Sequence, residues 1–83
     1  MRHARSVALD QLEDVLAALR GLPLLKERAR GVFYLRAQSF THFHEDPAGL
    51  FADLRAGTQF DRYPVNNAAE RQRFLAAVRA ALA

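Results

Sequence analysis

The chain contains 83 residues, of which 51% are hydrophobic, and its twelve Lys and Arg against nine Asp and Glu give a formal net charge of +3. This apolar fraction excludes a disordered chain, and the length predicts a single domain over residues 1–83. Because the sequence has no cysteine, disulfides and thiolate metal sites are excluded. No apolar run reaches the roughly 20 residues of a membrane helix, and acidic residues follow the basic start too soon for a signal peptide. We therefore expect a cytoplasmic protein that does not contact a membrane.

The basic residues are almost all Arg, and they are spread from Arg2 to Arg79, mostly beside acids. A nucleic-acid surface requires basic residues that cluster on one face. We therefore expect no nucleic-acid partner.

Leucines at spacings of three and four form a helical stripe in the first quarter of the chain: Leu9, Leu12, Leu16 and Leu19. This pattern predicts a helix that begins near Ser6, with acidic residues early and Arg20 late, as the helix dipole favours. Gly21 is predicted to end the helix in a left-handed conformation, and Pro23 prevents its continuation. The next segment, Leu25 to Arg28, allows a short helical turn or an extended edge segment, and we favour the extended form.

The middle of the chain is rich in aromatic and β-branched residues, with partial alternation of polar and apolar positions. The segments VFYLRA, SFTHFH and LFADLR predict three successive strands, whose short links make them antiparallel neighbours. Phe60 to Val65 is also predicted to be extended, and Pro64 keeps this segment out of the sheet interior. Asn67, with Glu70 three residues later, predicts the start of a helix that runs to near Ala83.

These elements predict an α+β domain with an N-terminal helix, an antiparallel meander of three to four strands and a C-terminal helix, both helices packing on one sheet face. Alanine contributes little burial, so the phenylalanines are expected to carry the core: Phe33, Phe40, Phe43, Phe51, Phe60 and Phe74. One sheet face is then uncovered, and a chain this short buries only about 60–65% of its unfolded surface. We therefore expect a homodimer, formed through that face or an edge strand, and a non-enzymatic assembly module as the function.

Two histidines stand one residue apart in the second predicted strand, so His42 and His44 point to the same face. Such a pair can share a divalent metal, and a zinc site needs a third protein ligand. The candidate third ligands are acidic: Glu45, Asp46 and, from the next strand, Asp53. His3 is expected to lie far away, in a frayed end. We expect no cofactor, and a metal such as zinc at His42, His44 and Asp53 is the alternative.

The turn after the histidines, residues 46–49 (DPAG), allows two registers for the hairpin that it closes. In the first register, Asp46 pairs with Leu50 across a three-residue loop with a bulge. Both histidines then share the apolar face of Ala52 and Leu54. Turn statistics favour this register, because plain type I turns splay the strands of a hairpin.

In the second register, Glu45 pairs with Leu50 across a two-residue loop, and Thr41 and Phe43 join the apolar face. The histidines then lie with the residues of the opposite face: Phe51, Asp53 and Arg55. Segregation of apolar from polar side chains favours this register, because a shift by one residue exchanges the two faces. The sequence leaves both registers open.

A second functional hypothesis is a ligand-binding site formed by the histidine strand and its neighbours: Tyr34, Arg36, His42, His44 and Asp53. No serine stands in the setting of a nucleophile, and no Gly-rich phosphate loop occurs. We therefore do not expect an enzyme.

The segment GVFYLRAQSFTHFHEDPAGLFADLRAG, about the middle third of the chain, resembles the small luciferase-like domains of uncharacterised bacterial proteins. Such segments carry an aromatic strand, a strand that ends in His-x-His and a strand of Leu-x-Leu character. The resemblance implies an α+β arrangement. It implies no light emission, and no catalytic residue carries over to this sequence.

Overall fold

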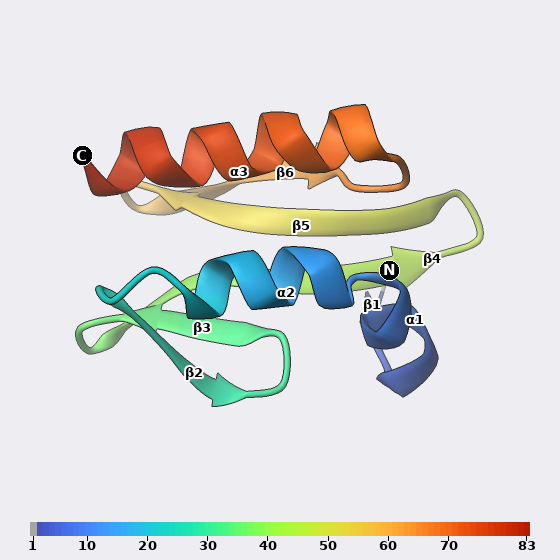
Figure 1. Cartoon of the computed structure of the whole chain (residues 1–83), viewed down its shortest axis with the longest axis horizontal. Coiled ribbons are helices and arrows are strands. Elements are labelled where there is room, and N and C mark those ends of the chain that lie inside the picture. The colour runs from blue at the N-terminus through green and yellow to red at the C-terminus, as the bar shows by residue number, and fades with distance from the viewer. Residues whose placement is uncertain (1) are drawn as a thin grey trace.

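The structure is a computed structural model that describes residues 2–83, which form three helices and a sheet of six strands. In chain order the elements are β1 (Arg2–His3), α1 (Ser6–Gln11), α2 (Glu13–Arg20), β2 (Leu25–Ala29), β3 (Val32–Leu35), β4 (Gln38–Asp46), β5 (Gly49–Ala56), β6 (Gln59–Pro64) and α3 (Ala68–Leu82). The α+β class is confirmed, with the helices on one side of the sheet (Figure 1). No helix within residues 2–83 has the length and hydropathy needed to cross a membrane.

The sheet is a continuous antiparallel meander in the order β2-β3-β4-β5-β6. It has more than the predicted three to four strands, because residues 25–29 form the edge strand β2, as we favoured, and β1 adds a short strand. Residues 59–64, predicted to be extended, form the opposite edge, β6. Pro64 lies in this edge strand, where its missing N–H is tolerated. The short strand β1 pairs with His44 and Glu45 of β4. Because β5 pairs with these two residues from one side, β1 lies on the opposite side of β4, beyond the end of β3.

The leucine stripe forms two consecutive helices that bury it against the sheet. All four leucines of the stripe are buried, as the spacing predicted. The helix is interrupted at Leu12, whose N–H bonds to the Leu9 carbonyl at 3.0 Å in a tightened turn. The prediction that Gly21 ends the helix in a left-handed conformation is wrong, because its φ is −76°. The Leu22 N–H bonds to the Leu19 carbonyl, so the chain leaves the helix through a right-handed turn.

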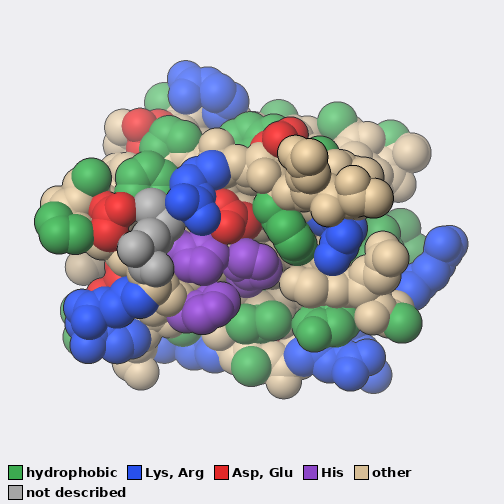
Figure 2. Space-filling model, turned by 180° about the vertical axis from the view of Figure 1, so that it is seen from behind, with side chains coloured by type: hydrophobic (Ala, Val, Ile, Leu, Met, Phe, Trp, Pro, Cys, Tyr) green, Lys and Arg blue, Asp and Glu red, His purple; other side chains and the backbone are tan. Residues whose placement is uncertain are grey.

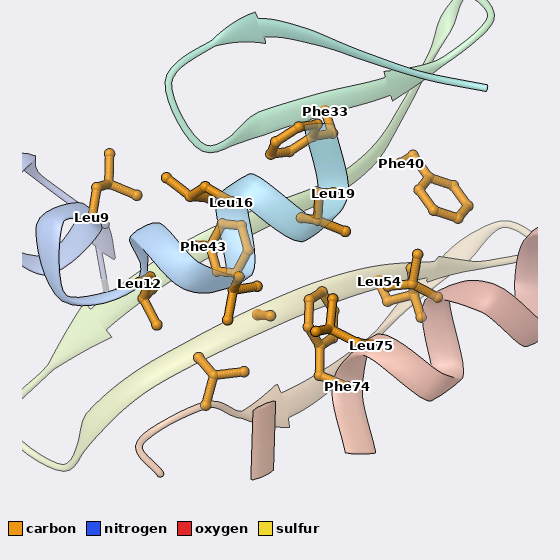
Figure 3. Packing of buried hydrophobic residues seen from close by; sticks show 14 residues of the cluster. Leu9, Leu12, Leu16, Leu19, Phe33, Phe40, Phe43, Leu54, Phe74 and Leu75 are labelled. Atoms are coloured by element: carbon orange, nitrogen blue, oxygen red, sulfur yellow. The ribbon is translucent and has the colours of Figure 1, made fainter. Parts of the chain in front are cut away.

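The core contains four of the six phenylalanines, packed between the sheet and the helices (Figure 3): Phe33, Phe40, Phe43 and Phe74. The prediction is wrong for Phe51 and Phe60. They pair across strands with His44 and Arg55, respectively, and lie with them on the uncovered face of the sheet. Phe40 reaches the core because the β3–β4 pairing shifts by one residue beside it, a local irregularity that the sequence does not signal.

The hairpin of β4 and β5 adopts the second of the two registers. Glu45 pairs with Leu50, and Asp46 pairs with Gly49 across a two-residue loop. The Asp46 carboxylate accepts a hydrogen bond from the Ala48 N–H at 2.7 Å, which stabilises this tight turn. Segregation of apolar side chains therefore outweighs the statistical preference of the turn.

The last helix begins as predicted. The Asn67 side chain accepts from the Glu70 N–H at 2.9 Å, and the Glu70 carboxylate accepts from the Asn66 N–H at 2.7 Å. The apolar face of α3 then buries Phe74 and Val78 against the sheet and α2.

Substitution of Gly31 by Ala is expected to destabilise the protein more than the same change at Gly57. Both glycines have a left-handed φ, +79° and +65°, which costs an L-residue about 1–2 kcal/mol. A Cβ at Gly31 would also lie 2.7 Å from Leu9 Cδ2, whereas nothing lies within 4 Å at Gly57. Urea denaturation should show a loss about 1 kcal/mol larger for Gly31→Ala; equal losses would contradict this packing of α1 on the β2–β3 turn.

Candidate metal centre

All three histidines of the chain gather at one place on the uncovered sheet face. Each of His3, His42 and His44 offers a ligand atom, and these atoms lie within 4.8 Å of one another. Figure 2 shows the three side chains as one purple patch on the face turned away from the viewer in Figure 1. His42 and His44 are one residue apart on β4, whereas His3 is brought to them by the pairing of β1 with β4.

The register of the hairpin places two of these histidines. With Glu45 opposite Leu50, alternation sends Phe43 into the core and His42 and His44 to the uncovered face. The two rings lie edge to face with centroids 5.0 Å apart. The β4 strand thus presents the two imidazoles side by side.

The third histidine comes from β1, and the expectation that His3 lies far away is wrong. His3 is the direct cross-strand partner of His44, and the two rings stack with centroids 4.8 Å apart. Ala4 extends the pairing with a hydrogen bond from its N–H to the Phe43 carbonyl at 3.0 Å. A strand of two residues carries no periodic pattern, which is why sequence reasoning missed this residue.

Glu45 fixes the segment that carries His3 and is not part of the histidine cluster. Its carboxylate accepts from the Arg5 N–H at 2.8 Å and lies 3.5 Å from the Arg2 guanidinium. Donation by the Arg5 N–H lowers the pKa of Glu45, so the anchor stays ionised. As candidate third ligands, Glu45 and Asp46 are thus engaged elsewhere, Glu45 with the arginines and Asp46 in the turn.

Asp53 lies beside the histidines and orients one of them. Its Oδ2 is 3.1 Å from His44 Nε2, and both its oxygens accept from Arg62, at 2.7 Å from Nε and 2.8 Å from Nη2. These hydrogen bonds from Arg62 lower the pKa of Asp53 despite its burial. The result is a fixed carboxylate that is held by Arg62 and directed at the His44 ring.

The ring nitrogens of the two β4 histidines have unusual surroundings. His42 Nδ1 and His44 Nε2 are 3.0 Å apart, so only one of them can carry the proton between them. His44 Nδ1 is buried and has no hydrogen-bond partner within residues 2–83. Burial, followed by the nearby charge of His44, lowers the pKa of His42, which favours the neutral form of its ring, the form that can bind a metal.

The remaining predicted site residues lie outside the cluster. Tyr34 is on the β3 strand, where the Arg28 guanidinium lies 4.8 Å from its ring centroid. Arg36 is exposed in the β3–β4 turn, with φ +57°. A residue that was not predicted, Phe60, stands against the cluster, with its ring centroid 4.9 Å from that of His42.

Comparisons with protein-family models, with curated proteins and with solved structures found no match to this chain. The resemblance to small luciferase-like domains therefore stays a prediction.

Replacement of Arg62 by Gln is expected to lower the free energy of unfolding by about 1–3 kcal/mol, because the Asp53 carboxylate, 7% exposed, loses its bidentate partner. The double variant Asp53→Asn, Arg62→Gln should recover part of the loss. Arg73→Gln, at an exposed position of α3, is the control and should stay within about 0.5 kcal/mol of the parent. Equal effects of Arg62→Gln and Arg73→Gln in urea denaturation would show that the ion pair contributes nothing.

Proposed function

We propose that this protein binds a divalent transition-metal ion such as zinc through His3, His42 and His44. The observation that carries the proposal is the convergence of every histidine in the chain, from two strands, on one point of the surface. Three imidazoles within reach of one ion satisfy the protein-ligand requirement that the His-x-His pair alone did not.

The nature of the ligands selects the class of metal. Imidazole nitrogen suits zinc, copper, nickel and iron, whereas magnesium and calcium require oxygen ligands. The cluster within residues 2–83 is made of histidines alone, with no carboxylate among the grouped ligand atoms. We therefore expect the protein to bind zinc, copper, nickel or iron, and not magnesium or calcium.

The surroundings of His44 support the same proposal. Metal-binding histidines commonly donate their second ring N–H to a carboxylate, which fixes the tautomer and the orientation of the ring. Donation of an N–H from His44 Nε2 to Asp53 would leave the lone pair on Nδ1, which has no hydrogen-bond partner within residues 2–83. A buried polar atom without a partner is rare in folded proteins, and coordination of a metal would account for it.

Untagged protein is expected to bind about one zinc ion per chain in equilibrium dialysis. Because the native site combines two strands, zinc should stabilise the folded state by about 2.7 kcal/mol at a free concentration of 100 Kd. That corresponds to a rise in melting temperature of about 10–20 °C for a domain of this size. Magnesium and calcium should cause no shift.

His3→Ala is the informative variant, because His3 is exposed and outside the core, so its loss should leave folding intact. We expect zinc affinity to fall by more than about tenfold, or about 1.4 kcal/mol. Tyr34→Phe, which removes a polar group from a neighbouring strand, is the matched control and should bind zinc as the parent does. Sub-stoichiometric zinc with an unchanged melting temperature, or equal affinity in both variants, would refute the metal site.

We also propose, as a second candidate, that the uncovered sheet face or an edge strand mediates assembly into a homodimer. Phe60 is 37% exposed on the edge strand β6, beside the histidines, and this supports an apolar contact there. Against a large apolar interface, the same face carries the charged side chains of Arg55 and Arg62. Metal binding is therefore the function that the geometry supports best.

Sedimentation velocity tests the assembly hypothesis. A homodimer should dissociate with dilution, and Phe60→Ser should shift it toward monomer, whereas Leu24→Ser, at an exposed leucine of the α2–β2 loop, should not. A monomer at high concentration, both with and without zinc, would eliminate the homodimer.

A further inference from the structure

Resting on the metal site proposed above, we propose that the bound ion keeps one coordination position open on the protein surface, and that this position takes a small anion, either a carboxylate or an inorganic anion of similar size.

The first step is the number of protein ligands. Zinc sites that are closed by protein use four ligands, whereas sites that bind exogenous molecules use three and leave the fourth position to solvent or substrate. The chain has three histidines and no cysteine, so histidine and cysteine together can supply at most three ligands. Among the side chains of residues 2–83, a carboxylate is then the usual zinc ligand that is left to close the site.

Asp53 is the nearest acidic side chain, and it is held away from that role. Arg62 occupies both its carboxylate oxygens, and Oδ2 also faces His44 Nε2. Coordination by Asp53 would break this bidentate pair and leave Arg62 without its partner, at the cost of charge-assisted hydrogen bonds. Asp53 is therefore a positioning residue that orients His44.

The second step is charge. Three neutral imidazoles leave the full double positive charge on the ion, because no protein ligand brings a negative charge to it. Asp53, the anion that contacts His44, is already balanced by Arg62, and Arg55 adds a further positive charge on the same face, 4.8 Å from the Phe60 centroid. An anion in the open position reduces this excess, so anions are favoured over neutral ligands.

The third step is access. The cluster lies on the sheet face that the helices leave uncovered (Figure 2), and the His3 side chain is exposed. The Phe60 ring stands on one side, in contact with His42 and covered by Arg55. A small anion can thus approach from solvent while one flank of the site stays apolar.

Cobalt-substituted full-length protein provides the test, because the visible absorption of Co²⁺ depends on its ligands. We expect azide, and separately acetate, to change the spectrum with saturation at one anion per cobalt. Perchlorate, which coordinates poorly, controls for ionic strength and should cause no change. Neither anion should bind protein without metal, as measured by calorimetry.

The possible failures are distinguishable. If cobalt binds at full stoichiometry and azide changes nothing, the fourth position is closed and this inference is wrong, while the metal site stands. If azide acts only on Asp53→Asn, Asp53 itself fills the position, and the inference is again wrong. If cobalt causes dimerisation and the spectrum does not respond to azide, a second protein chain fills the fourth coordination position, and the inference is wrong. If cobalt does not bind at all, the metal site and the anion site fail together.

Discussion

The register of the β4–β5 hairpin is the constraint on which the rest of the molecule depends. With Glu45 opposite Leu50, Phe43 and Leu54 enter the core, and His42, His44 and Asp53 face outward. A shift by one residue would exchange these sets. It would expose side chains whose burial is worth about 1.5–3 kcal/mol each, and it would move a carboxylate and two imidazoles into the apolar core. The free energy of burial is thus what places the histidines at the surface.

The candidate metal centre is a set of cross-strand neighbours that this register creates. His42 faces Asp53 on β5, Asp53 faces Arg62 on β6, and His44 faces His3 on β1. Each contact joins residues that are far apart in the sequence, at the spacing of adjacent strands. The centre needs no long loop or deep cavity, because the flat face of the sheet provides its frame.

The weakest part of that frame is β1, which has two residues and is held by the backbone pairing and by Glu45. Short peripheral segments contribute little stability of their own. An ion that bridges His3 to the β4 histidines would tie this segment to the sheet, so metal binding and the docking of β1 support each other. A homodimer formed through the uncovered face, in place of an edge strand, would have to share that face with the metal centre.

The sequence by itself determined the elements that depend on local signals. The leucine stripe predicts the helical region from Ser6 to Arg20, the Asn67–Glu70 cap predicts the start of α3, and residues 46–49 predict a turn, because capping, period and turn chemistry act between near neighbours. His42 and His44 could also be assigned to one face, because a strand alternates.

Only the tertiary structure decided which face that was, and which residues join the pair. The turn chemistry and the apolar pattern predicted opposite registers. The structure has the register that the apolar pattern favours, in which Phe43 packs against Phe74. His3 and Arg62 reach the site through strand pairings across roughly forty and nine positions of the chain, respectively. No local pattern specifies such pairings, because they form only when several strands bury their apolar faces together.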